Sequence, residues 1–244
     1  MTITAVIPAR LGSTRLPGKV LADIQGRPLI WHVWNRVRQA EQIAEVFVAT
    51  DADEVRAAVE GWGGRVVMTS PECRSGTHRI ASVLDQFAGE FLLNVQGDEP
   101  MIEPAMLDSL VECWRRTRAP LVTPVYRLQT LSQLQDPNLV KVVRAGDGTA
   151  LYFSRSAVPY VRDVPLEHWM DRHAFWGHVG VYGYAREVLA NYDQLPPSGL
   201  EETERLEQLR FLEAGLSFQT VETVYHPISV DTPQDLERVR QIMK

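Results

Sequence analysis

A group of basic side chains lies near the start of the sequence, at a place where phosphate binding is common. Residues 8–19 read PARLGSTRLPGK, directly follow an apolar run and contain Arg10, Arg15 and Lys19. Glycine lets backbone N–H groups approach an anion closely, while arginine and lysine supply positive charge. The segment is not a Walker A loop, because its glycine spacing differs and Val20 stands where Ser or Thr would bind magnesium. We interpret it as a cradle for a polyphosphate, with a solvated basic loop as the alternative.

Two aspartates stand where strands are expected to end. Asp98 lies in the segment VQGDEP at 95–100, and Asp231 lies in VDT just before the terminal helical pattern. Magnesium prefers oxygen ligands, typically one or two protein carboxylates completed by phosphate and water. We therefore expect Asp98 to bind magnesium, with Asp231 as the candidate second ligand. Turn formation by Asp98 and helix capping by Asp231 are the simpler alternatives.

Five other polar segments are too common to indicate a function individually, and they are informative only when they are considered together. They are residues 74–79 (RSGTHR), 150–155 (ALYFSR), 177–184 (GHVGVYGY), 199–201 (GLE) and 206–210 (LEQLR). Taken alone, the first is a turn that opens a helix, and a histidine in an apolar run, such as His178, is more often structural than catalytic. A glutamate such as Glu207 usually lies on the solvent-exposed face of an amphipathic helix.

Strands and helices alternate in the first half of the sequence. Apolar runs at 2–7, 46–49, 66–68 and 91–95 predict strands, and helical patterns at 28–39, 53–59, 79–87 and 104–118 follow them in turn. This alternation predicts an α/β fold, with a mostly parallel sheet flanked by helices. Ligands of such sheets bind beyond the carboxyl ends of the strands, where the loops after Ile7, Ala49 and Val95 gather.

The pattern changes near residue 120. Segments 121–126, 140–143, 150–153 and 178–184 predict strands without a helix between each pair, and 159–176 is expected to be an irregular excursion. Helices are predicted at 201–214 and 232–243, with a strand at 218–224. We expect a single domain over residues 1–244, with a lobe inserted at about 120–190.

Composition and charge exclude several classes of protein. The 244 residues are 45% hydrophobic and 23% charged, which is typical of a globular chain with one sizeable core. The net charge of −6 argues against a nucleic-acid partner, whereas residues 1–38 carry six cations against one anion, a net +5 that suits a small polyanionic substrate. Cys73 and Cys113 predict neither a disulfide framework nor a zinc site. With no signal peptide and no long apolar run, we expect a cytoplasmic location without membrane insertion.

Together the motifs resemble those of the 3-deoxy-D-manno-octulosonate (Kdo) cytidylyltransferases, also called CMP-Kdo synthetases. The shared segments, in family order, are IPAR at 7–10, RLPGK at 15–19, ATD at 49–51, SGT at 75–77, NVQGDEP at 94–100, YFSR at 152–155, LEQLR at 206–210 and VDTP at 230–233. The resemblance implies a Rossmann-like, glycosyltransferase-A-like nucleotidyltransferase fold, whose inserted lobe serves sugar binding and dimerisation. It also implies a homodimer, Mg²⁺, and the conversion of CTP and Kdo into pyrophosphate and CMP-Kdo for lipopolysaccharide biosynthesis.

The resemblance further implies roles for individual residues. The catalytic set would be Arg10, Lys19, Asp98 and Asp231, of which the two aspartates would bind the metal. The nucleotide would be bound by Arg10, Gly12, Ser13, Arg15, Lys19, Ser75, Gly76, Thr77, Arg79 and Gln96. The acceptor sugar would be bound by Arg155 at its carboxylate and by His178, Tyr182, Glu207 and Gln208 at its hydroxyls.

Three places depart from the family pattern. Residues 226–229 read HPIS where a glycine-containing segment is usual, Gly177 replaces what is more often a basic residue, and His78 stands where an acidic residue is common. Because of these departures, another acidic sugar, such as 8-amino-Kdo or a sialic-acid-like sugar, is an alternative to Kdo as the acceptor substrate. A non-catalytic nucleotide-binding module is a further alternative, but such a module would be expected to lose Lys19 or one of the two aspartates.

Overall fold

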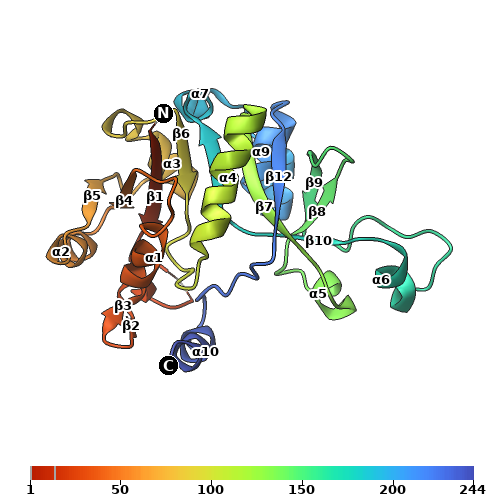
Figure 1. The fold of residues 1–244 in the computed structure, drawn as a ribbon, viewed down its shortest axis with the longest axis horizontal. Helices are drawn as coiled ribbons and strands as arrows, with labels where there is room; N and C mark the ends of the chain where they lie inside the picture. Colours follow the sequence, from red (N-terminus) through yellow and green to blue (C-terminus); the bar gives the residue numbers. More distant parts are fainter. Residues whose placement is uncertain (1, 14) are drawn as a thin grey trace.

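The computed structural model describes residues 2–13 and 15–244, and it contains one large sheet with helices on both faces (Figure 1). The strands are β1 (Ile3–Ala9), β2 (Asp23–Ile24), β3 (Arg27–Pro28), β4 (Glu45–Thr50), β5 (Arg65–Met68), β6 (Phe91–Asn94), β7 (Leu121–Arg127), β8 (Lys141–Arg144), β9 (Ala150–Ser154), β10 (Trp176–His178), β11 (Tyr182–Ala185) and β12 (Phe218–Thr223). The α-helices are α1 (Leu29–Val37), α2 (Asp53–Gly61), α3 (Gly76–Ala81), α4 (Pro104–Thr117), α5 (Leu131–Gln135), α6 (Trp169–Arg172), α7 (Arg186–Ala190), α8 (Gly199–Glu204), α9 (Gln208–Glu213) and α10 (Pro233–Ile242). Short 3₁₀ turns lie at Lys19–Leu21, Leu84–Gln86, Leu166–His168 and Tyr192–Gln194.

The large sheet is mixed, with most strands running in one direction. Its order is β5-β4-β1-β6-β11-β7-β10-β8-β9, and β12 pairs with β7. The pairs β4–β5, β1–β4, β1–β6 and β7–β12 are parallel, while β11, β10 and β9 run against their neighbours. The predicted α/β class with a mostly parallel sheet is confirmed.

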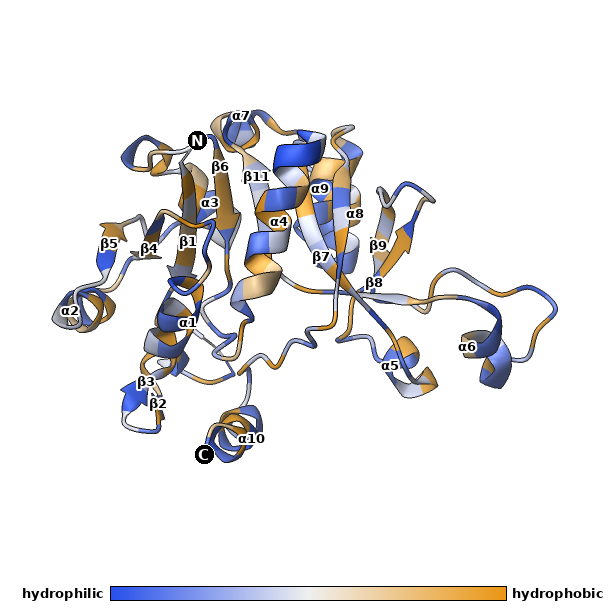
Figure 2. Cartoon of the chain, viewed as in Figure 1, coloured by the Kyte–Doolittle hydropathy of each residue, from blue (hydrophilic) through white to orange (hydrophobic). Residues whose placement is uncertain are grey.

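The two faces of the sheet bury separate hydrophobic clusters. In β1, Ile3, Ala5 and Ile7 pack into the cluster that includes residues of α1, α2 and α4, whereas Val6 packs into the cluster that includes residues of α3, α7 and α9. This alternation follows from the two-residue repeat of a strand. Figure 2 shows the apolar strands in the interior and helices of mixed polarity around them. Buried on both sides, the sheet forms a rigid base for the loops at its carboxyl ends.

The strand predicted at 178–184 is interrupted. Both β10 and β11 lie along β7, with β11 beside Leu121–Val122 and β10 beside Val125–Arg127. On the other side, β11 pairs with β6 but β10 pairs with β8, so the sheet divides next to residues 179–181. There the Val181 N–H donates to the Val179 carbonyl at 2.7 Å in a tight turn. The interruption places His178 and Tyr182 at the opening between β6 and β8.

The residues predicted as an inserted lobe, 120–190, share this sheet. Strands β7 and β11 belong to its centre, and β10, β8 and β9 extend it on one side. Figure 1 shows α5 and α6 projecting from this end, with α6 at the tip of a long excursion. Residues 120–190 therefore supply both central strands and one end of the same sheet, joined by irregular connections.

Two predicted helices have different limits. The helix expected at 201–214 is divided into α8 and α9, because Arg205 adopts a left-handed conformation with φ of 56°. The helix expected at 79–87 begins earlier, as α3, because the Ser75 side chain accepts the His78 N–H and caps its start.

The sequence predicted no disulfide framework and no membrane-spanning segment. Cys73 and Cys113 are both free and buried. In residues 2–13 and 15–244, none of the helices has the length and apolar character that crossing a membrane requires.

The glycine at 177 is explained by packing. A Cβ atom there would lie 2.6 Å from Cζ of Tyr126 and 2.8 Å from Cδ2 of Leu128, two side chains that are almost fully buried. The departure from the more usual basic residue therefore reflects a position without space for a side chain.

We expect Gly177→Ala to lower the free energy of unfolding by about 1–3 kcal/mol, because the added methyl group overpacks this contact. Gly146→Ala is the control, since a Cβ at Gly146 meets nothing within 4 Å. Thermal unfolding of both variants measures the difference. Equal midpoints would contradict the packing explanation.

Candidate active site

The first cavity lies at the carboxyl ends of β1 and β6 and has a volume of about 320 Å³. Its lining includes eight of the residues predicted to bind the nucleotide: Arg10, Ser13, Arg15, Lys19, Ser75, Gly76, Arg79 and Gln96. Asp98 and Asp231 line the same cavity. Gly12 and Thr77 do not line it. The structure thus brings together segments that lie far apart in the sequence.

The basic loop after β1 is closed by its own backbone. The Leu11 carbonyl accepts from the N–H groups of Ser13 at 2.8 Å and Gly18 at 3.1 Å. Gly18 has a φ of 68°, a left-handed conformation that favours glycine, and it directly precedes the 3₁₀ turn that begins at Lys19. The fold of the loop returns the chain so that Arg15 and Lys19 face the ends of distant segments.

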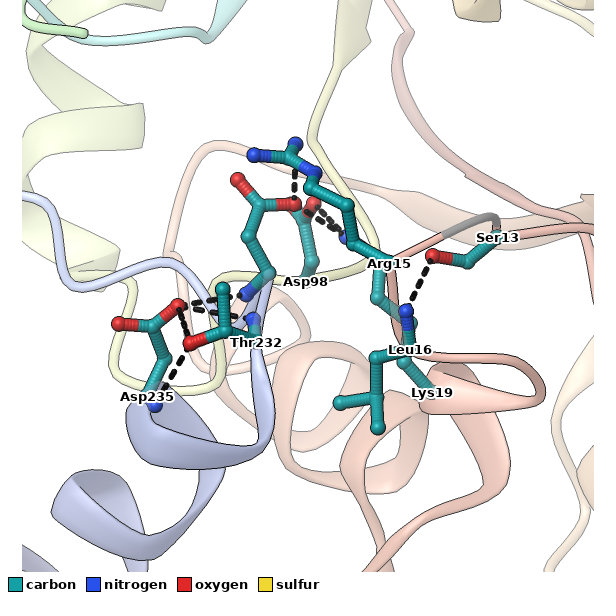
Figure 3. Close-up of polar contacts among 8 residues, drawn as sticks. Ser13, Arg15, Leu16, Lys19, Asp98, Thr232 and Asp235 are labelled. Atoms are coloured by element: carbon teal, nitrogen blue, oxygen red, sulfur yellow. Dashed lines mark hydrogen bonds and ion pairs between the residues drawn. The ribbon is translucent and has the colours of Figure 1, made fainter.

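Lys19 joins the two predicted metal ligands. Its Nζ lies 2.6 Å from Oδ2 of Asp98 and 2.9 Å from Oδ1 of Asp231, and Arg15 Nη2 lies 3.0 Å from the same Asp231 oxygen. Figure 3 shows the side chains of Arg15, Lys19 and Asp98 converging beside the start of α10. Burial acts to lower the pKa of Lys19, but the carboxylates of Asp98 and Asp231 outweigh it and the pKa is raised. Lys19 therefore remains a cation between two anions.

Backbone contacts place the two aspartates side by side. The Val230 N–H donates to the Asp98 carbonyl at 2.9 Å, which ties the segment before α10 to the loop after β6. The cap of α10 is Thr232, which forms a reciprocal capping box with Asp235. Asp231 is not the cap, so its carboxylate is available to Lys19 and Arg15.

Asp98 and Asp231 fit a magnesium ion that is coordinated partly by these carboxylates and partly by a nucleotide. Two carboxylates meet at one ammonium group, and Mg²⁺ typically takes one or two protein carboxylates together with phosphate oxygens. Across residues 2–13 and 15–244, no group of three or more His, Cys, Asp or Glu side chains is arranged to hold a metal. Asp98 and Asp231 supply the two carboxylates that such an ion would take from the protein.

Arg79 has a structural contact within the cavity wall. It is 3% exposed, its Nη2 lies 3.0 Å from Oδ2 of Asp51, and its Nη1 donates to Thr69. These contacts connect α3 to the ends of β4 and β5. Arg79 thus lines the cavity while its charge is already paired.

A second cavity of about 360 Å³ adjoins the first. It is lined by Gly76, Gln96, Glu99, Asn138, Leu139, Val140, His178, Gly180, Tyr182, Arg205, Leu206, Glu207, Gln208, Pro227 and Ser229. Gly76 and Gln96 belong to both cavities, so the two meet at one shared wall. Four of the residues predicted to bind the sugar lie here, namely His178, Tyr182, Glu207 and Gln208. We refer to this space as the acceptor cavity.

Glu207 faces the interior rather than solvent. The break at Arg205 turns it inward, where its carboxylate accepts from the Thr77 hydroxyl. Thr77 also contacts the Tyr184 hydroxyl at 2.8 Å and is fully buried. Burial raises the pKa of Glu207, with smaller opposing effects from Ser75 and Thr77. Thr77 therefore holds a wall of the acceptor cavity, although it does not line the nucleotide cavity.

Arg155 lies outside the acceptor cavity. Its guanidinium donates to the carbonyls of Pro137 at 3.0 Å and Glu204 at 2.7 Å and contacts that of Arg205 at 3.4 Å. In this structure its donors are directed to backbone rather than to the place predicted for a sugar carboxylate. Arg155 instead connects two cavity-lining segments, the loop after α5 and the turn between α8 and α9.

A buried lysine reinforces the same connection. Lys141 is fully buried, and its Nζ donates to the carbonyls of Asp136 at 2.8 Å, Leu139 at 2.6 Å and Arg155 at 2.5 Å. Burial lowers its pKa, with partial compensation from Asp136. Lys141 and Arg155 together hold one side of the acceptor cavity.

Glu99, Asn138 and Arg205 are among the residues that line the acceptor cavity but were not predicted as site residues. Glu99 is 4% exposed, accepts from the Tyr225 hydroxyl at 3.3 Å, and burial together with the neighbouring Asp98 raises its pKa to about 8. Its position beside Asp98 in the VQGDEP segment could have indicated that Glu99 lies near the site. Asn138 and Arg205 lie in a loop and at a helix break, for which periodicity gives no signal.

We expect Lys141→Met to lower the free energy of unfolding by about 2–4 kcal/mol, because three carbonyl groups lose their buried donor. Lys244→Met is the matched control, since Lys244 is exposed at the end of the chain. Chemical denaturation of the two variants measures the difference. A midpoint for Lys141→Met equal to that of the control would show that the ammonium group is dispensable.

Comparisons with known proteins agree with this geometry. A family model described as cytidylyltransferase matches residues 4–221. The 3-deoxy-manno-octulosonate cytidylyltransferase of Geobacter sulfurreducens is 46% identical, with 100% of both chains covered, and that of Myxococcus xanthus is 47% identical, with 98% of this chain and 96% of the relative covered. A solved structure of CMP:2-keto-3-deoxy-manno-octonic acid synthetase complexed with CTP has a TM-score of 0.93 at 42% identity, covering 100% of this chain and 98% of that chain. With its full-length relatives, its fold and its paired cavities, this chain belongs to the 3-deoxy-manno-octulosonate cytidylyltransferase family of nucleotidyltransferases.

Proposed function

We propose that this chain transfers the cytidylyl group of CTP to Kdo, giving CMP-Kdo and pyrophosphate. The anomeric hydroxyl of the sugar would attack the α-phosphorus, and the bond from that phosphorus to the bridging oxygen of pyrophosphate would break. The observation that carries the proposal is the shared wall at Gly76 and Gln96, which joins a cavity with cations and two aspartates to an acceptor cavity. Family membership supports the choice of CTP and Kdo.

Neutralising charge is the main task of the first cavity. CTP and a sugar carboxylate bring together about five negative charges, which repel strongly at short distance. Arg10, Arg15 and Lys19 line the cavity and would bind the triphosphate. Preorganised cations of this kind lower the barrier by stabilising charge that is redistributed during phosphoryl transfer.

Asp98 and Asp231 would hold the magnesium ion. When bound, the ion would neutralise phosphate charge and lower the pKa of a coordinated hydroxyl. Lys19 now occupies the contact between the two carboxylates, so it would turn toward the phosphate oxygens of the nucleotide as the carboxylates take up other partners.

The acceptor cavity would orient the sugar. His178, Tyr182, Glu207 and Gln208 line it and would contact the sugar hydroxyls. Because the guanidinium of Arg155 is bonded to backbone carbonyls, we propose that this residue acts on the sugar through the turn between α8 and α9. Pro227 and Ser229 also line the cavity, so one of the departures from the family pattern lies where another acidic sugar would be distinguished.

We also propose the homodimer that the family resemblance implies. The excursion that contains α6 projects from the body (Figure 1). Tyr160, which lies on this excursion, is 74% exposed. Light scattering of the purified protein measures the mass directly. The cytoplasmic location stays a prediction.

Turnover of CTP with Kdo and Mg²⁺ is the direct test, measured by pyrophosphate release. We expect activity with CTP but at least about tenfold less with UTP or ATP, and a higher kcat/KM for Kdo than for 8-amino-Kdo or a sialic acid. A higher kcat/KM for another sugar would show that Kdo is not the acceptor, but the proposed cytidylyl transfer would stand. Absence of pyrophosphate release with every sugar would reject the enzyme function.

Asp98→Asn should reduce magnesium-dependent turnover by about 10²–10³-fold, because it removes a carboxylate that would hold the metal ion at the reacting phosphate. The fold should be retained, since the Asp98 side chain is 25% exposed. Asp85→Asn, at an exposed position remote from both cavities, is the control and should keep full activity. Pyrophosphate release at saturating CTP is the measurement, and undiminished turnover in Asp98→Asn would assign the metal to other groups.

A further inference from the structure

The two ring nitrogens of His178 have different surroundings. Nε2 lies 2.8 Å from Oγ1 of Thr123. Nδ1 has no hydrogen-bond partner in the described part of the chain, and it is not among the fully buried polar atoms that lack one. Because His178 lines the acceptor cavity, Nδ1 is the ring nitrogen that is open to a ligand there.

Thr123 determines which nitrogen carries the proton. Thr123 lies in β7, is fully buried, and donates its hydroxyl hydrogen to the Val181 carbonyl at 2.7 Å. A carbonyl can only accept, and a threonine hydroxyl has a single hydrogen. The Thr123 oxygen must therefore accept from His178, which requires Nε2 to be protonated.

The imidazole is also kept neutral. Its ring lies 5.1 Å from that of Phe153 and 5.3 Å from that of Tyr182, centroid to centroid. Burial lowers the pKa of His178 to about 3. With one proton placed on Nε2, Nδ1 keeps its lone pair and offers the cavity a hydrogen-bond acceptor.

Gln208 holds the hydroxyl of Tyr182, whose ring lies beside the imidazole. It is 2% exposed, its Oε1 accepts from the Tyr182 hydroxyl at 3.1 Å, and its Nε2 is buried without a partner. Both Gln208 and His178 line the acceptor cavity and both contact Tyr182. The exposed acceptor in this part of the cavity is therefore Nδ1 of His178, and a polyhydroxylated sugar acid carries hydroxyl groups that can donate to it.

We propose that Thr123 is a positioning residue that fixes His178 as the Nε2–H tautomer, so that Nδ1 accepts a hydrogen bond from a hydroxyl of the acceptor sugar. The inference rests on the proposed function for the identity of the ligand, and the tautomer itself rests on the contacts of Thr123. Thr123, which does not line the acceptor cavity, would thus determine how His178 binds the sugar hydroxyl.

The first test is spectroscopic and uses the full-length protein without substrate. Two-bond ¹H–¹⁵N correlation spectra of protein labelled with ¹⁵N-histidine distinguish the tautomers, and His178→Gln assigns the signal. We expect the Nε2–H form of neutral His178 at pH 7. The Nδ1–H form or an imidazolium would overturn the proposal.

The second test compares variants kinetically. Thr123→Val should raise KM for Kdo by about tenfold, the effect of one neutral hydrogen bond, with KM for CTP unchanged and a mixed tautomer signal. Thr123→Ser keeps the hydroxyl and should restore both readouts. Thr220→Val is the control, because Thr220 is similarly buried on the neighbouring β12 but contacts Gly148 and Arg144. An equal change in KM for both substrates, or no rescue by serine, would leave Thr123 a purely structural role and reject the proposal.

The two tests separate this inference from the proposed function. Turnover of Kdo by the unaltered protein tests the function, whereas the tautomer is observed without any sugar. Failure of turnover together with an Nε2–H signal would reject the function and the sugar contact. Turnover together with an Nδ1–H signal would reject only the role of Thr123.

Discussion

The contact of one ammonium group with two carboxylates organises the active site. Lys19 comes from the loop after β1, Asp98 from the loop after β6 and Asp231 from the residues before α10. Such a cluster is stable only if its opposite charges compensate one another, since each partly buried charge loses solvation. The backbone bond between Val230 and Asp98 holds the two carboxylates in place, so that the loop, the sheet and the last helix depend on a common geometry.

The acceptor cavity depends on a second constraint, the division of the sheet beside residues 179–181. There β11 stays with β6 while β10 turns to β8, and His178 and Tyr182 flank the opening. Lys141 and Arg155 hold the loops that close the opposite side. A rigid sheet thus places a polar cavity next to the nucleotide cavity, with Gly76 and Gln96 between them.

Periodicity and motif spacing predicted the parallel half of the fold well, because β1 and its neighbours alternate regularly with helices. They also predicted that the basic loop after β1 and Asp98 after β6 would meet, since strand ends converge at one edge of such a sheet. The strand end expected at Asp231 was wrong, because residues 224–232 form no strand and the bond from the Val230 N–H to the Asp98 carbonyl holds this segment in place. Side-chain roles beyond that depended on tertiary contacts. Glu207 turns inward only because Arg205 breaks the helix, and Arg155 is directed to backbone carbonyls by loops whose conformation no local pattern specifies.

A crystal structure with CTP and Mn²⁺, whose anomalous signal locates the ion, addresses the central claim most directly. The account predicts one nucleotide with its triphosphate within hydrogen-bond distance of Arg15 and Lys19, and an ion that is coordinated by phosphate and by both Asp98 and Asp231. A triphosphate bound away from the basic loop, or an ion that contacts neither aspartate, would contradict it.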